Sequence, residues 1–144
     1  MSPNGRKGNT SIIAYATKPG DYLEKRKAAF ADAAIPLDTC ADAGLLIERL
    51  SRNPVPSLTI IHSSVSRGML ETNGEVVGIK LYQMTRKLHP LMLLIVIADD
   101  MEACKLFKSH PSTISDWRLM TFLPAPQNGD QELISEVRIM LALV

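Results

Sequence analysis

The sequence lacks any strong charge imbalance and any long hydrophobic run. Among its 144 residues, 16 lysines and arginines against 15 aspartates and glutamates give a formal charge of +1. Proteins that bind mainly nucleic acid or anionic membranes usually carry a surplus of basic residues, so we expect neither partner. The longest apolar run, residues 91–98, is too short to cross a bilayer, which takes about 20 residues.

Cysteine is also scarce, and several signature motifs are missing. Cys40 and Cys104 stand alone, without the spacing of a metal site or a C-x-x-C motif. We expect two reduced, buried thiols in a cytoplasmic protein, because free cysteine behaves as a small hydrophobe. The sequence has no G-x-G-x-x-G, no Walker A sequence and no G-x-S-x-G, so nothing indicates a nucleotide cofactor or a hydrolase triad.

The N-terminal residues differ from the rest of the chain. Residues 1–10 are polar and have no apolar stretch of the kind found in secretion signals. We expect a disordered lead-in over residues 1–10 and one domain over residues 11–144, a length that suffices for a single buried core.

What the sequence does contain is a regular alternation of short apolar runs and segments of helical period. The runs predict strands at residues 11–16, 35–39, 58–62, 91–97 and 117–123. The periodic segments predict helices that end near residue 34 and at residues 42–50, 73–88, 99–109 and 130–143. Leu45, Leu46 and Leu50 are expected on the inner face of the second helix, which Asp42 would cap.

This alternation predicts the α/β fold class, a doubly wound five-stranded parallel sheet with helices on both faces. Pro36 cannot donate to a strand ladder, so residues 35–39 belong at a sheet edge. Together with right-handed crossovers, this favours the flavodoxin-like strand order 2-1-3-4-5. Residues 91–97 are apolar on both faces and are expected to form a buried strand.

The order and spacing of these elements resemble the receiver domain of two-component response regulators, over residues 11–143. Pro19 follows the first strand, where the family often has proline, and residues 53–58 resemble the family's lead into the third strand. Residues 123–126 resemble the turn that normally carries a lysine and then a cis-linked proline. The resemblance implies a bacterial signalling domain.

The resemblance also implies which positions should carry chemistry. A working receiver holds Mg²⁺ with two acidic residues after the first strand, and a carboxylate ending the third strand accepts the phosphoryl group. A hydroxyl after the fourth strand and a lysine after the fifth contact that group. Here these positions fall on Ala16, Thr17, His62, Ala98 and Ala125. The resemblance therefore implies a pseudo-receiver that is not an enzyme, binds no metal at this site and needs no phosphorylation.

His62 has its own claim to function, because open sheets of this kind bind ligands at the carboxyl ends of their strands. Ser63, Ser64 and Arg67 follow it. Hydroxyls and an arginine in one loop can hold an anion, and a plain solvated loop is the alternative.

Three other features have simpler explanations. Asp99 and Asp100 could bind metal at a strand end, but we expect a helix cap. Trp117 is expected to pack in the core or at its rim. The basic run at residues 25–27 is expected to be a solvated helix face.

The favoured hypothesis is a non-catalytic signalling domain of a larger regulator, acting by contact with a protein partner or with a second copy of itself. The contact is expected on the fourth helix, fifth strand and fifth helix. The residues proposed for it are Met101, Cys104, Lys105, Lys108, Arg118, Met120 and Arg138. The alternatives are a small-ligand sensor that uses the vacated pocket and an enzyme built on a flavodoxin-like sheet.

Overall fold

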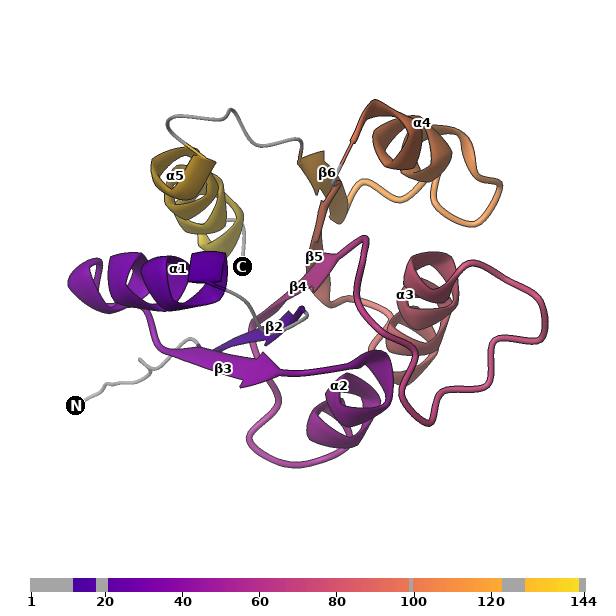
Figure 1. The fold of residues 1–144 in the computed structure, drawn as a ribbon, viewed down its shortest axis with the longest axis horizontal. Helices are drawn as coiled ribbons and strands as arrows, with labels where there is room; N and C mark the ends of the chain where they lie inside the picture. Colours follow the sequence, from indigo (N-terminus) through magenta and orange to yellow (C-terminus); the bar gives the residue numbers. More distant parts are fainter. Residues whose placement is uncertain (1–11, 18–20, 99, 123–128, 143–144) are drawn as a thin grey trace.

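The computed structural model describes residues 12–17, 21–98, 100–122 and 129–142 (Figure 1). Its strands are β2 (Ile13–Ala16), β3 (Leu37–Cys40), β4 (Leu58–His62), β5 (Leu93–Ile97) and β6 (Leu119–Phe122). Its helices are α1 (Asp21–Asp32), α2 (Ala43–Leu50), α3 (Val77–Leu88), α4 (Met101–Ser109) and α5 (Gly129–Leu141). Within the described residues, no helix is long and apolar enough to span a bilayer.

The five strands form one parallel sheet in the order β3-β2-β4-β5-β6. This is the predicted order 2-1-3-4-5, and the strand that follows Pro36 lies at an edge as expected. All five residues of β5 are buried, as its apolar sequence predicted. The predicted fold class is therefore confirmed.

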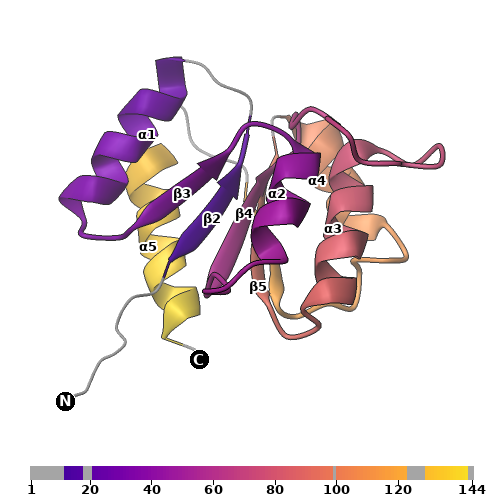
Figure 2. The ribbon, with the colours of Figure 1, turned by 90° about the horizontal axis from the view of Figure 1, so that it is seen from below.

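Helices cover both faces of the sheet, with α1 and α5 on one face and α2, α3 and α4 on the other (Figures 1 and 2). Side chains alternate along each strand, so every strand serves two cores. In β2, Ala14 and Ala16 point to the three-helix side, while Ile13 and Tyr15 point to the two-helix side. Packing on both faces thus holds the carboxyl ends of the strands in place, where open sheets of this kind bind ligands.

Several predicted boundaries differ from the structure for local reasons. The third helix begins at Val77, not at residue 73, because Asn73 and Gly74 have φ values of 52° and 86°. Such left-handed backbone cannot continue a right-handed helix. The last strand begins at Leu119, because Leu119 N–H donates to the Asp116 carbonyl at 3.2 Å and closes a turn over Trp117 and Arg118.

The helix caps expected at Asp42 and Asp100 are confirmed, Asp99 lies outside the described residues, and one inner-face prediction was wrong. The Asp42 carboxylate accepts from Leu45 N–H at 2.8 Å, and the Asp100 carboxylate accepts from Ala103 N–H at 2.8 Å. Leu46 and Leu50 are buried, but Leu45 is exposed. The side of α2 next to Leu50 is filled instead by Arg49, whose Nε lies 2.6 Å from Asp38 Oδ2.

The run at residues 25–27 is not a uniform solvated face. Lys25 and Lys27 are exposed, but Arg26 is only 8% exposed. Its guanidinium donates to the Tyr15 hydroxyl at 2.7 Å and to the Asp130 carboxylate at 2.8 Å. Burial alone lowers the pKa of Arg26, but these two partners outweigh it and raise the pKa, so the charge is retained. One arginine thus ties α1 to β2 and α5.

Both cysteines are free and buried, as predicted. Burial, followed by the nearby charge of Asp38, raises the pKa of the Cys40 thiol to about 11. A thiol with so high a pKa is a poor nucleophile at neutral pH.

Candidate functional site

The sheet brings the predicted phosphorylation positions together at its carboxyl edge. Ala16 pairs in register with Ile61, and His62 pairs with Ile97. The ladder continues one step further, since Ser63 N–H donates to the Ile97 carbonyl at 2.8 Å. The ends of β2, β4 and β5 therefore lie side by side, which places Thr17 and Ala98 at the same edge. Ala125 lies outside the described residues.

These positions carry no group that suits phosphoryl transfer. Ala16, Thr17 and Ala98 are buried, and His62 is half-buried. Two carboxylates on neighbouring helices, those of Asp42 and Asp100, serve as helix caps. In the described part of the chain, no group of three or more His, Cys, Asp or Glu side chains is placed to hold a metal ion. A hard cation such as Mg²⁺ needs oxygen ligands of this kind.

His62 is oriented by the loop that follows it. Its Nδ1 lies 3.1 Å from the Ser64 hydroxyl oxygen. Since a hydroxyl can both donate and accept, this contact suits either tautomer of the ring. The arrangement holds the imidazole against its own loop.

Beyond Ser64 the loop turns away from this edge toward α2. The backbone of Ser66 pairs with that of Asp42 as in a parallel sheet, and the Ser66 carbonyl accepts from Ala43 N–H at 2.8 Å. Gly68 has a φ of 61°, and a Cβ on it would lie 2.3 Å from the Asp42 carboxylate. The loop is therefore pinned to the N-terminus of α2, so Arg67 is carried toward α2 while Ser63 and Ser64 stay with His62.

The residues proposed for protein contact separate into two groups. Met101, Lys105 and Lys108 are exposed on α4, and Arg118 and Met120 are half-buried beside them. Cys104 is only 5% exposed, because it shares the inner stripe of α4 with Phe107, so a partner cannot reach it.

Arg138 lies on a different side of the molecule from the α4 residues. Its guanidinium donates to the Ala33 carbonyl at 3.3 Å, so it faces the end of α1. Because of this contact, Arg138 does not belong to the same surface as the exposed residues of α4.

Sequence reasoning missed the most exposed apolar groups of this region. Trp117 is 69% exposed, so the expectation that it packs in the core or at its rim was wrong. The Arg118 guanidinium carbon lies 4.0 Å from the centre of the Trp117 ring, a cation–π arrangement. Ile114 is exposed nearby in the turn that leads to β6. The adjacency of Trp117 and Arg118 in the sequence could have indicated this exposed pair.

A cluster around Asp116 holds that turn in place. The Asp116 carboxylate accepts from the Tyr82 hydroxyl at 2.6 Å, from Arg86 Nε at 2.9 Å and from Arg118 N–H at 3.0 Å. Burial alone raises the pKa of Asp116, but these donors outweigh it and lower the pKa below its usual value. The turn that carries Trp117 is therefore fixed to α3 by a charged group.

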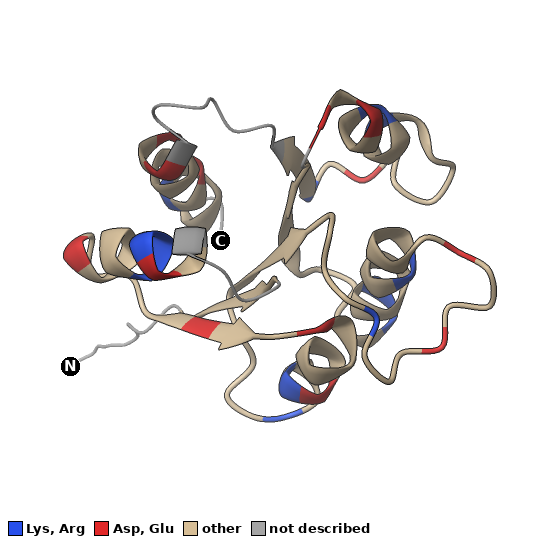
Figure 3. Cartoon of the chain, viewed as in Figure 1, with Lys and Arg blue, Asp and Glu red and all other residues tan. Residues whose placement is uncertain are grey.

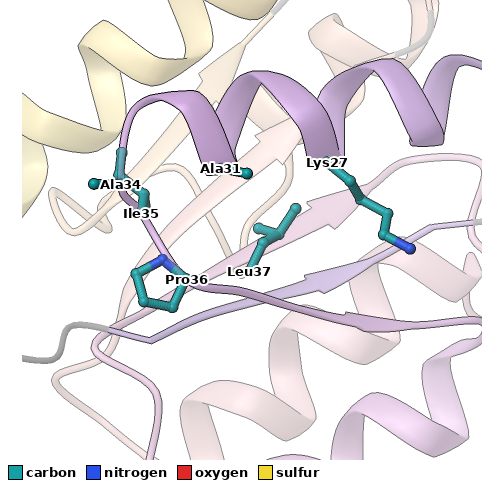
Figure 4. A pocket seen from close by; sticks show the side chains of 6 residues that line it. All are labelled: Lys27, Ala31, Ala34, Ile35, Pro36 and Leu37. Carbon is teal, nitrogen blue, oxygen red and sulfur yellow. The ribbon is translucent and has the colours of Figure 1, made fainter.

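Several cavities lie along the described surface. One of about 420 Å³ runs beside the edge strand β3, and Figure 4 shows the side chains that line it, namely Lys27, Ala31, Ala34, Ile35, Pro36 and Leu37. One of about 390 Å³ lies between α2, α3 and the loop around Met69. Another, of about 210 Å³, lies between α4, the turn before β6 and β6 itself.

Comparisons with known proteins give a clear answer only at the level of fold. No family model and no curated protein matches the sequence. A response regulator receiver protein from Sinorhizobium medicae WSM419 is similar in structure, with a TM-score of 0.70 and 14% identity over 93% of this chain and 96% of that one. A receiver domain protein from Methanospirillum hungatei JF-1 gives a TM-score of 0.68 and 16% identity over 93% and 95% of the two chains.

A de novo designed Rossmann 2x3 protein is also similar, with a TM-score of 0.64 and 8% identity over 90% of each chain. A designed protein has this arrangement of strands and helices without being related by descent, so these structural similarities establish the fold alone. The chain therefore has the five-stranded parallel fold of the response regulator receiver domains.

Proposed function

We propose that this chain is a non-catalytic signalling domain that acts by protein–protein contact and does not depend on phosphorylation. The observation that carries the proposal is the composition of the carboxyl edge. The sheet register brings the ends of β2, β4 and β5 together, and this supports the assignment of Ala16, Thr17, His62 and Ala98 to the positions where receivers have acidic and hydroxyl groups. Because none of these four residues is a carboxylate, they can neither hold Mg²⁺ through carboxylate oxygens nor form an aspartyl phosphate.

The contact surface lies on α4 and on the turn before β6. We define the α4–β6 surface by its exposed or half-buried residues Met101, Lys105, Lys108, Ile114, Trp117 and Arg118. Tryptophan, arginine and methionine are enriched at protein interfaces, and an exposed tryptophan stacked on arginine is typical of a binding anchor. Lysines on α4 supply a charged rim around this apolar centre.

Net charge and composition support a protein partner over other classes. A formal charge of +1 does not suit binding to nucleic acid or an anionic membrane. The partner is a second protein or another copy of this chain, in two-component signalling in the cytoplasm.

The first test is chemical. Incubation with Mg²⁺ and acetyl phosphate or beryllofluoride should leave the mass and the amide NMR spectrum unchanged at millimolar metal. A stable acyl phosphate, or metal-dependent shifts at Thr17, His62 and Ala98, would contradict the proposal.

The second test addresses the surface. Charge reversal at Lys105, Lys108 or Arg118 should weaken partner capture in a pull-down, or shift the oligomeric state in sedimentation. The same reversal at Lys25 and Lys27, exposed on α1 across the sheet, is the matched control and should have no effect (Figure 3). If the α4 reversals are silent and changes at His62 abolish function, the ligand-sensor alternative replaces this proposal.

A further inference from the structure

The two edges of the sheet are protected very differently. An edge strand exposes unpaired N–H and C=O groups, and proteins usually guard such edges with proline or charge. At β3 the guard is present, since Pro36 precedes the strand and Asp38 lies within it, paired with Arg49. Within β6 the sequence Leu-Met-Thr-Phe has neither charge nor proline, and the Arg118 that precedes it is stacked on Trp117.

The ladder shows which backbone groups of β6 face outward. Leu94 N–H donates to the Arg118 carbonyl at 2.9 Å, and Leu94 pairs in register with Leu119. In a parallel ladder, the backbone N–H and C=O groups of every second residue point to the same neighbouring strand. The backbone groups of Met120 therefore also point to β5, whereas those of Leu119 and Thr121 point away from it. Leu119 N–H is used in the turn, which leaves the Leu119 C=O and both backbone groups of Thr121. Among the described strands, none pairs with this side of β6.

A cavity lies beside these outward groups. The cavity of about 210 Å³ is lined by Leu119 and Thr121, which are two apart and share one face of the strand. Phe107 and Lys108 of α4 form its other wall, and Ile114 lies in the turn at its end. A strand added to β6 would direct alternate side chains toward this cavity. Main-chain pairing beside a side-chain pocket is the recurring geometry of strand addition.

The charges around the cavity indicate the chemistry of that strand. Lys105 and Lys108 are one helical turn apart, and Lys108 lines the cavity. Within the described residues neither lysine forms an ion pair, while the only acidic lining group, Asp116, is already bound by Tyr82 and Arg86. On α4, Lys105 and Lys108 stand against one exposed carboxylate, that of Glu102 one turn before Lys105, so the helix carries a net positive charge beside the cavity, which suits acidic side chains.

We propose that the outer edge of β6 binds an extended, acidic segment of a partner protein by β-strand addition. Backbone groups of Leu119 and Thr121 pair with the added strand, and its acidic side chains lie against Lys105 and Lys108. This inference rests on the proposed function and specifies the partner's chemistry at the α4–β6 surface.

The test uses the intact chain and a capped eight-residue peptide that alternates valine and glutamate. Trp117 is the single tryptophan and is exposed beside β6, so its fluorescence reports binding directly. Hydrogen exchange should show the Thr121 amide becoming at least about tenfold more protected on binding, because it gains a hydrogen bond. The Met120 amide already faces β5 and should not change. Binding of a valine–lysine peptide at equal strength would overturn the charge argument.

Matched variants separate backbone pairing from side-chain contact. Thr121→Pro removes the outward N–H and spares the ladder with β5, so it should weaken peptide binding about tenfold. Thr121→Val retains the N–H and should bind within about twofold. If Thr121→Pro fails to fold, a peptide with a central proline tests the same hydrogen bonds on the unchanged protein, and undiminished binding would overturn strand addition.

The remaining outcomes distinguish this inference from the proposed function. Loss of partner capture on charge reversal at Lys105 and Lys108, with capture retained in Thr121→Pro, would overturn strand addition and leave the protein-contact proposal standing. Capture unaffected by all of these changes would overturn both. Protection of Thr121 that grows with protein concentration in the absence of peptide would show that a second copy occupies the edge, which overturns the acidic partner.

Discussion

Replacement of Asp116 by asparagine tests whether a partly buried charge fixes the turn that presents Trp117. The substitution keeps the shape of the side chain but removes its charge. Hydrogen bonds to charged groups contribute about 1.5–3 kcal/mol each. Arg86 keeps part of its bonding, because its Nη1 still donates to the Met92 carbonyl at 2.7 Å and to the Pro90 carbonyl at 3.1 Å. Its buried Nη2, which lies 2.7 Å from Asp116 Oδ2, loses its charged partner. We therefore expect a loss of about 2 kcal/mol in the free energy of unfolding, less than the sum of the bonds.

The pH dependence of this loss follows from the direction of the pKa shift. The donors around Asp116 lower its pKa in the folded protein below the ordinary value of 3.8. A lowered pKa stabilises the fold above the unfolded pKa, and this contribution is lost as the pH falls through the folded pKa. The difference between Asp116→Asn and the unchanged protein should thus be full at neutral pH and should shrink in acid.

Urea denaturation followed by circular dichroism, repeated from neutral pH to about pH 3, measures this difference directly. Asp32→Asn is the control, because Asp32 is an exposed carboxylate at the end of α1. That control should change the free energy of unfolding by less than about 0.5 kcal/mol. A loss at Asp116 equal to that of the control, or one that stays constant down to the lowest pH, would refute the reasoning.

Two further substitutions test contacts that position the loops and helices. Gly68→Ala places a Cβ against the Asp42 carboxylate and should lower the free energy of unfolding clearly more than Gly74→Ala does. At Gly74 φ is also positive, but nothing lies within 4 Å of the added atom. Equal losses for the two variants in urea denaturation would contradict the clash. Arg26→Met should lose about 2 kcal/mol because it breaks two hydrogen bonds at a buried charge, whereas Lys27→Met on the exposed side of the same helix should be near neutral in thermal denaturation.

The fold could be predicted because its determinants are local. Pro36 identified the edge strand, the fully apolar sequence of β5 identified a buried strand, and Asp42 and Asp100 identified two helix starts. Each of these signals depends on the chemistry of one residue or on the period of a short segment. The edge position given by Pro36 and the right-handed crossovers then left few topologies to choose from.

Side-chain placement could not be predicted in the same way, because it depends on which helix packs beside which. Arg26 reads as one cation in a run of three, yet α5 and β2 supply Asp130 and Tyr15 around it. Cys104 and Arg138 lie on helices of the expected face, but one points inward and the other toward α1. The period of a sequence predicts which face of a helix is buried. It does not predict which side chain of another element each of the other residues will contact.

Charged side chains in this fold divide into those that brace it and those that remain available for recognition. Arg26, Arg49 and Arg86 each pair with a carboxylate from another part of the chain, and their side chains are largely buried. Such bridges act within the chain and leave no charge for a partner. Lys105 and Lys108 have no such role among the described residues, and they stand beside the one sheet edge that lacks a guard. Lys25, Arg52, Arg67 and Lys87 are also exposed and form no ion pair within the described residues, but Lys108 lines the cavity beside the outer edge of β6 and Lys105 lies one turn before it. An acidic strand is therefore the partner that this surface fits.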